Sequence, residues 1–145
     1  MTEQEQRDAV VAAARSFIGT PYHHNARVKG VGVDCATLLE MSYTEAGVVS
    51  PMDVTEYSSQ WHLHSDEPLY ERAIIAQGAG LADAPGVGDI VLYFQGRQFA
   101  HGAIISEVEP LRIIHAYAAS RGVVEGYETE FGALSGVKRK FFSTW

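Results

Sequence analysis

The sequence has 145 residues, of which 46% are hydrophobic and 20% are charged, and its formal net charge is −7 at pH 7. This balance is typical of a folded globular chain, and the length predicts a single domain, residues 1–145. An acidic chain lacks the basic face that nucleic-acid binding requires. No apolar run approaches the roughly 20 residues of a membrane-spanning helix, so neither nucleic acid nor a membrane is an expected partner.

Cys35 is the only cysteine in the sequence, which excludes an internal disulfide and zinc sites built from CxxC pairs. Residues 1–6 are acidic and polar and do not have the pattern of a secretory signal. We therefore expect synthesis in the cytoplasm without a signal peptide. If the target lies outside the cell, another component must deliver the protein.

The first half of the chain has helical patterns. Thr2 and Glu5 form a capping-box pattern, and the apolar spacing that follows predicts a helix that Gly19 ends. Residues 22–32 are expected to form a loop with a positive bias. Its basic and histidine residues are His23, His24, Arg27 and Lys29.

A second helix is predicted from about Cys35 to Ala46, because Asp34 is a good N-cap residue and Gly47 can end a helix. Cys35 then lies in the first turn, at the positive end of the helix macrodipole. Such a position lowers the pKa of a thiol and favours the reactive thiolate.

Between the second and third helices we expect a turn at residues 51–55 and an irregular or short helical segment at residues 58–65. The histidines of that segment, which we expect to be solvated, are His62 and His64. Pro68 suits the first position of a third helix, which the apolar spacing extends to a stop at Gly78.

From about residue 86 the pattern changes to short apolar runs separated by glycine-bearing turns, which predicts strands. The predicted strands cover residues 89–94, 100–108, 111–118, a segment after residue 122, and 136–142. Helices followed by a meander of strands indicate an α+β fold with an antiparallel sheet.

Two histidines lie in neighbouring predicted strands. A cysteine nucleophile needs a base and a third group that orients the base. His101 and His115 belong to strands joined by a turn at Glu109-Pro110, and the two-residue period of a strand places them on one face, roughly opposite each other. We expect this face to point at the N-terminus of the second helix. Cys35 would then be the nucleophile, His101 the base and His115 the orienting group.

The order of these motifs resembles that of the NlpC/P60 cysteine peptidases, over about residues 19–117. The resemblance is greatest for the phage-type cell-wall peptidases of tails and gene transfer agents. Its motifs are Tyr22, Asp34-Cys35, Pro85-Gly-Val-Gly-Asp-Ile-Val-Leu92, Ala100-His-Gly-Ala-Ile-Ile105 and Ile114-His-Ala116.

The resemblance implies a papain-like α+β fold, with N-terminal helices packed on an antiparallel sheet. It implies hydrolysis of peptidoglycan stem peptides, commonly between D-glutamate and a diamino acid, without a metal or cofactor. Cys35 matches the nucleophile, His101 the base, His115 the third polar residue and Tyr22 a tyrosine of the oxyanion site. The phage-type resemblance implies phage-tail or gene-transfer-agent tail proteins as partners, and delivery in a particle to the periplasm and cell wall.

The sequence departs from the family after Tyr22, where residues 23–26 replace an aromatic residue and two glycines, and after Cys35, where Ala36 and Thr37 replace serine and glycine. One alternative is therefore a catalytically silent structural or wall-binding tail module of the same fold. Another is a zinc site, because Cys35 and the two strand histidines form a possible three-ligand set. Arg27 and Lys29 are either solvated or bind carboxylates of a wall peptide.

Overall fold

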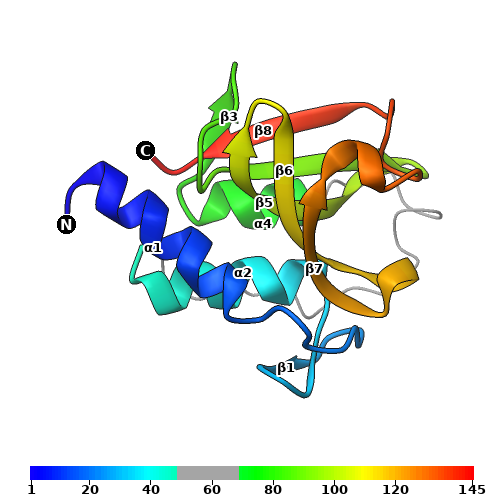
Figure 1. Cartoon of the computed structure of the whole chain (residues 1–145). Helices are drawn as coiled ribbons and strands as arrows, with labels where there is room; N and C mark the ends of the chain where they lie inside the picture. The colour runs from blue at the N-terminus through cyan, green and yellow to red at the C-terminus, as the bar shows by residue number, and fades with distance from the viewer. Residues whose placement is uncertain (49–68) are drawn as a thin grey trace.

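The computed structural model describes residues 1–48 and 69–145, in which helices come first and a six-stranded antiparallel sheet follows (Figure 1). The strand order in the sheet is β3-β8-β4-β5-β6-β7. The turn expected at 51–55 and the segment 58–65 with its two histidines lie outside the described residues. No helix in the described ranges is long and apolar enough to cross a membrane.

Helix α1 (Glu3–Arg15) begins with the predicted capping box of Thr2 and Glu5. It ends at Arg15 rather than at Gly19. The reason is tertiary, because the N–H of Gly19 donates to the carbonyl of Val123 in the sheet, at 3.1 Å, and so leaves the helical hydrogen-bond pattern. Gly19 itself adopts a positive φ of 92°, a conformation that glycine tolerates well.

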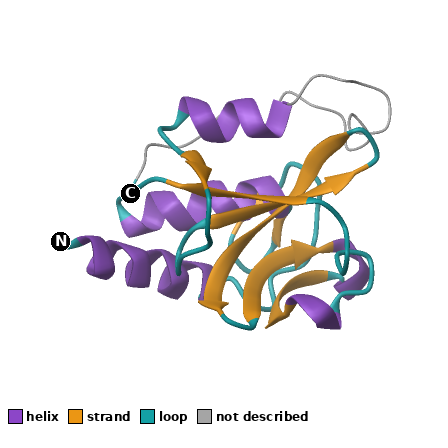
Figure 2. Ribbon diagram, turned by 90° about the horizontal axis from the view of Figure 1, so that it is seen from above, coloured by secondary structure: helices purple, strands orange, loops and turns teal. Residues whose placement is uncertain are grey.

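Helix α2 (Cys35–Ala46) has the predicted bounds, with Asp34 as the N-cap and Gly47 in the left-handed region at φ 73°. Nine of its 12 residues are buried, because it lies beside α1 and also packs on the sheet (Figures 1 and 2). Helix α4 (Leu69–Ala76) matches the third predicted helix.

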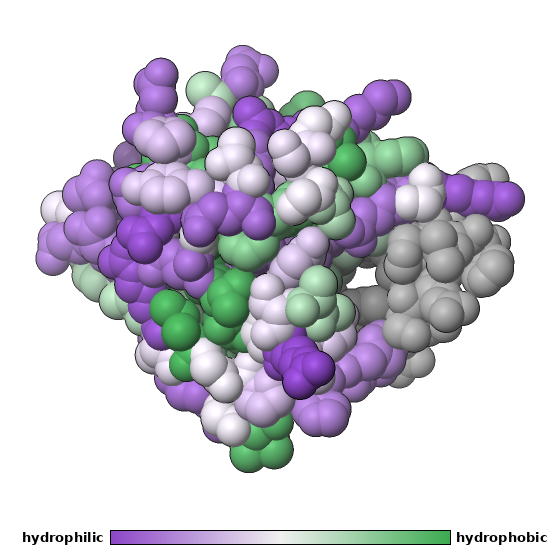
Figure 3. All heavy atoms as spheres, turned by 45° about the vertical axis from the view of Figure 1, so that its right-hand side comes forward, coloured by the Kyte–Doolittle hydropathy of each residue, from purple (hydrophilic) through white to green (hydrophobic). Residues whose placement is uncertain are grey.

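The segment predicted as a loop at 22–32 contains a short hairpin. Strands β1 (Arg27–Val28) and β2 (Gly32–Val33) pair antiparallel, with Arg27 opposite Val33. Val28 and Val31 of this hairpin are exposed. The face of the molecule in Figure 3 is largely hydrophilic, with small hydrophobic patches.

The sheet contains the strands predicted from the short apolar runs, with somewhat different bounds. Their bounds are β3 (Gly80–Ala82), β4 (Ile90–Gln95), β5 (Gln98–Val108), β6 (Leu111–Tyr117), β7 (Gly122–Tyr127) and β8 (Arg139–Ser143). Strand β3 was not predicted. The last strand starts at Arg139 instead of residue 136, because Gly136 adopts a positive φ of 80° in the preceding turn.

The two faces of the sheet pack in different clusters. Ile104 of β5 and Ile114 of β6 are partners in the ladder and pack in the cluster that contains α1 and α2. Their neighbours Ile105 and Ile113 pack in a second cluster with Leu134. Side chains alternate along a strand. Over residues 101–105 of β5 and in β6, even-numbered residues therefore face the helices and odd-numbered residues face the second cluster.

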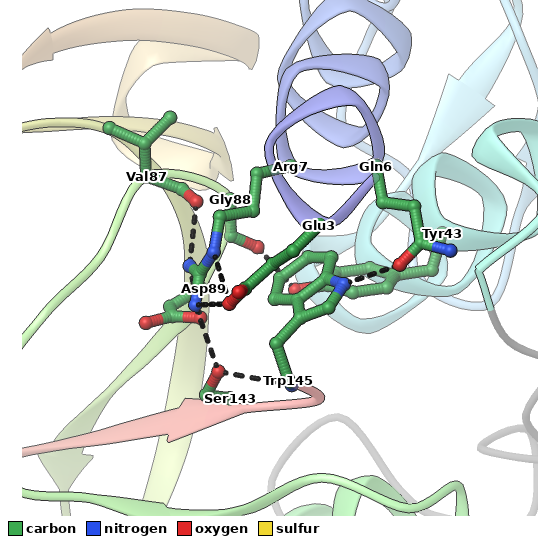
Figure 4. A network of polar contacts seen from close by, with 9 residues as sticks. All are labelled: Glu3, Gln6, Arg7, Tyr43, Val87, Gly88, Asp89, Ser143 and Trp145. Carbon is green, nitrogen blue, oxygen red and sulfur yellow. Dashed lines mark hydrogen bonds and ion pairs between the residues drawn. The ribbon is translucent and has the colours of Figure 1, made fainter. Parts of the chain in front are cut away.

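Polar contacts join both ends of the chain to the sheet (Figure 4). Arg7 of α1 donates to the buried carboxylate of Asp89 and to the carbonyl of Val87, both at 2.9 Å. Its guanidinium lies 4.4 Å from the ring centroid of Trp145, whose indole N–H donates to Gln6 at 2.7 Å. These contacts hold α1 and the C-terminal residue against the start of β4.

Candidate active site

Cys35 is the first residue of α2, and local hydrogen bonds fix its position. The carboxylate of Asp34 accepts from the N–H of Thr37 at 2.9 Å, and the hydroxyl of Thr37 accepts from the N–H of Asp34 at 2.8 Å. The thiol of Cys35 donates to the carbonyl oxygen of Ala100 at 3.7 Å. The thiol therefore lies beside the residue that precedes His101 in β5, and Cys35 as a whole is only 8% exposed.

A β-bulge shapes this part of β5. Tyr93 of β4 pairs with His101, whereas Phe94 pairs with Phe99, so Ala100 is an extra residue in β5. A bulge bends its strand and changes the direction of neighbouring side chains, and bulges are frequent beside active sites. Here the carbonyl of the extra residue faces the thiol of Cys35. No glycine marks this bulge in the sequence, which explains why it was not predicted.

His101 and His115 form a hydrogen bond between Nε2 of His101 and Nδ1 of His115, at 2.8 Å. The ladder pairs Ile104 with Ile114, and this register makes the two histidines diagonal neighbours rather than directly opposite residues. Their rings meet edge to face, with centroids 5.1 Å apart. Diagonal neighbours on one face remain within reach of ring side chains, so the predicted pair does form.

The face that carries this pair differs from the expectation. Ile104 and Ile114 point to the face of the sheet that packs on the helices. His101 and His115 are at odd-numbered positions of the same strands, so they point to the opposite face, as Ile113 does. We expected them on the face that packs against α2. The bulge at the start of β5, rather than a shared face, brings the thiol of Cys35 to this stretch.

The hydrogen bond between the imidazoles restricts the tautomers of the pair. When His101 donates from Nε2, its Nδ1 has no proton and can act as a base. His115 then accepts at Nδ1 and, as a neutral ring, carries its own proton on Nε2. That Nε2 is buried and has no hydrogen-bond partner among the described residues.

Burial keeps both imidazoles uncharged at neutral pH. The loss of water around the ring lowers the pKa of His101 to about 4. The same cause, with the neighbouring imidazole as a second one, lowers the pKa of His115 to about 2. An uncharged His101 can accept a proton, which a general base must do.

Aromatic residues surround the pair. Tyr117 stacks on His115 with ring centroids 4.8 Å apart and an interplanar angle of 21°. Phe131 meets the ring of His115 edge-on at 4.4 Å, and Tyr93 lies 6.1 Å from His101. None of these three aromatic residues was predicted to belong to the site. The two-residue spacing of His115 and Tyr117 on one strand was a signal that could have placed Tyr117 there.

Tyr22 comes to the same region by a backbone route. It forms a bridge with Val33, just before the N-cap of α2, and its N–H donates to the carbonyl of Arg121 at 3.0 Å. The pKa of Tyr22 is raised by burial and by the neighbouring groups of Cys35 and Asp34. The phenol therefore keeps its proton at neutral pH and can act as a hydrogen-bond donor.

The β1–β2 hairpin is attached to α2 by ion pairs. Arg27 pairs with the buried carboxylate of Glu40, and Lys29 pairs with Glu45 at 2.8 Å. The N–H of Asn25 donates to the carboxylate of Asp34 at 2.8 Å. Arg27 and Lys29 thus bind carboxylates of the chain itself, while Lys29 remains exposed to solvent.

The zinc alternative finds no support in the described part of the chain. Within residues 1–48 and 69–145, no group of three or more His, Cys, Asp or Glu side chains is arranged to hold a metal ion. Cys35 and the two strand histidines therefore do not form a three-ligand set.

No family model matches the sequence, and no curated protein is detectably similar to it. Solved structures do match. The NlpC/P60 domain of the peptidoglycan hydrolase SagA is 21% identical, with a TM-score of 0.59 over 96% of this chain and 98% of that chain. The P60 domain of an antigen from M. avium subspecies paratuberculosis is 16% identical, with a TM-score of 0.58 over 97% of this chain and 96% of that chain.

The peptidoglycan hydrolase RipB from Mycobacterium tuberculosis is 14% identical, with a TM-score of 0.59, and the match covers 97% of this chain and 65% of that chain. At identities this low, the structural matches establish a common fold, and the activity has to be argued from the site. The predicted fold class is confirmed: this chain has the α+β fold of NlpC/P60 domains.

Proposed function

We propose that this protein is a cysteine peptidase that hydrolyses peptide bonds in the stem peptides of peptidoglycan. The observation that carries the proposal is the thiol of Cys35 beside the bulge that precedes His101, whose imidazole is hydrogen-bonded to His115 at 2.8 Å. The shared fold supports it, since two of the matching structures are described as peptidoglycan hydrolases.

The chemistry assigns one role to each residue. His101 accepts the thiol proton at Nδ1, and the thiolate of Cys35 attacks the carbonyl carbon of the scissile bond. The phenol of Tyr22 donates to the oxyanion, a contribution of up to a few kcal/mol in comparable sites. Protonated His101 then gives its proton to the leaving amine. Water, deprotonated by His101, hydrolyses the thioester and restores the thiol, while His115 keeps His101 oriented.

We further propose that the bond cleaved joins D-glutamate to a diamino acid, and that tail proteins of a phage or gene transfer agent carry the enzyme to the wall. Support for both comes from the resemblance of the motifs around Tyr22, Cys35 and His101. The ion-paired hairpin at 27–33 directly follows residues 23–26, where the sequence departs from the family, so it is the element we expect to adjust the choice of substrate.

The test is digestion of purified peptidoglycan, with released fragments identified by mass spectrometry. Wild type should release stem-peptide fragments whose masses name the bond. Cys35→Ala and His101→Gln should release none while keeping the circular dichroism spectrum of the wild type. His23→Gln is the matched control, because His23 is exposed, and it should cleave like the wild type. Fragments from Cys35→Ala would refute the proposal.

A second candidate is a silent wall-binding module, which the 8% exposure of Cys35 favours. It predicts binding to peptidoglycan without released fragments and no selective alkylation of Cys35. Iodoacetamide labelling below pH 8 that is lost in His101→Gln would exclude it, because an ordinary buried thiol, with a pKa of about 8.5 or more, reacts poorly there.

A further inference from the structure

We propose that Tyr117 is a positioning residue for the imidazole pair: its ring fixes the orientation of His115 and shields both imidazoles from water. The inference rests on the proposed function only for its consequence in catalysis. The packing that carries it is independent of the substrate.

Among the described aromatic residues, Tyr117 alone has ring contacts with both histidines. Its ring stacks on His115 at 4.8 Å and meets His101 edge-on, with centroids 5.8 Å apart. The side chain is half-buried, whereas His115 is fully buried. Tyr117 therefore lies between the pair and the solvent.

The backbone holds this ring in place. Tyr117 ends β6 and pairs with Gly122 of β7, and the segment that precedes Tyr22 crosses directly over that glycine. A Cβ at position 122 would lie 2.5 Å from the carbonyl oxygen of Thr20. The close approach leaves the end of β6 little freedom, so the ring of Tyr117 is well placed to restrain its neighbours.

His115 depends on such restraint. Its Nδ1 is bonded to His101, but its buried Nε2 has no hydrogen-bond partner among the described residues. Among the described residues, the bond to His101 is thus the only hydrogen bond that orients this ring. The ring of His115 is also enclosed by two aromatic rings: Tyr117 stacks on it and Phe131 meets it edge-on. The centroids of these two aromatic rings are 5.3 Å apart.

The ionisable groups that face the pair come from several elements. Tyr93 of β4 faces His101, and its phenol donates to Glu128 at 2.7 Å. Glu128 in turn pairs with Arg139 of β8, which balances its charge. On the helix side, Cys35 lies beside the start of β5, with Tyr22 near it.

With these charges balanced, burial is the first cause of the low pKa values of His101 and His115. Water admitted by removal of Tyr117 would stabilise the charged rings and raise both values.

The experiment measures the imidazole titrations directly by NMR of the ring protons, in wild type, Tyr117→Phe and Tyr117→Ala. We expect Tyr117→Phe to titrate like the wild type, because it keeps the ring. We expect Tyr117→Ala to raise the titration of His101 from about 4 toward its usual value by at least about one unit. Tyr127→Ala is the control, because Tyr127 is exposed on β7 and stacks with Arg112.

Activity supplies a second readout. The acid limb of the pH profile of kcat/KM reports the base of the free enzyme, so it should move to higher pH in Tyr117→Ala and stay in place in Tyr117→Phe and Tyr127→Ala. If Tyr117→Ala does not fold, Tyr117→Val, which suits a strand end, takes its place with the same expectation.

The outcomes separate the two proposals. A wild type that releases no fragments refutes the proposed function, while the titrations still decide the role of Tyr117. An active wild type with an unchanged acid limb and unchanged titrations in Tyr117→Ala or Tyr117→Val overturns the inference alone. A raised titration in these variants, with Tyr117→Phe unchanged, supports it.

Discussion

Acidification should destabilise this protein strongly, because two uncharged imidazoles are buried together. In the unfolded chain both would have a pKa near 6.5, whereas in the folded chain the values are about 4 for His101 and about 2 for His115. Below about pH 6.5 the unfolded state therefore binds more protons than the folded state, and the free energy of unfolding decreases as the pH falls. The full stability is present above that pH.

The size of the effect follows from these values. At pH 5 each imidazole is protonated almost completely in the unfolded chain and scarcely at all in the folded chain, which lowers the free energy of unfolding by about 2 kcal/mol per ring. The two rings together give about 4 kcal/mol between pH 7.5 and pH 5. That is a large fraction of the roughly 5–15 kcal/mol that stabilises an ordinary domain.

Urea unfolding followed by tryptophan fluorescence at pH 7.5 and pH 5 measures this difference. His115→Gln should lose about half of the pH dependence, because one of the two titrating rings is gone. His23→Gln should keep all of it, since His23 is exposed. A wild type whose free energy of unfolding changes by less than about 1 kcal/mol between the two pH values would refute the reasoning.

Two further predictions concern stability. Arg7→Ala should lower the free energy of unfolding by about 3–5 kcal/mol, because it leaves the buried carboxylate of Asp89 without its partner. Arg15→Ala is the control: it removes a more exposed ion pair and should lower the free energy of unfolding by about 1 kcal/mol or less. If urea unfolding finds equal losses, the Arg7 pair is not the anchor of α1. Gly122→Ala should destabilise the folded protein, because the new Cβ would lie 2.5 Å from a backbone oxygen. Gly132→Ala should not, because its Cβ would meet nothing within 4 Å. Similar thermal midpoints for the two variants would contradict this prediction.

Features with local causes were predictable. The start and end of α2 depend on Asp34 and Gly47, whose capping contacts lie within the helix and its first turn. The capping box at Thr2 is equally local. Short apolar runs between turns predicted β4, β5 and β6, and the order of the motifs predicted the fold that the solved structures share.

Features with distant causes were not predictable. Helix α1 ends early because Gly19 bonds to β7. Arg27 lies in a hairpin that was predicted as a loop, and it pairs with Glu40 of α2. Each of these contacts joins segments whose proximity no local pattern reports.

The candidate site divides in the same way. The sequence by itself determined which residue types occur in which order: a cysteine at a helix start, then histidines in two neighbouring strands. Only the tertiary structure decided that the histidines are diagonal neighbours, that they lie on the parity opposite the helices, and that the bulge at Ala100 meets the thiol of Cys35. The physical reason is that register and face depend on which strands pair and on what covers each side of the sheet, and a single extra residue changes both.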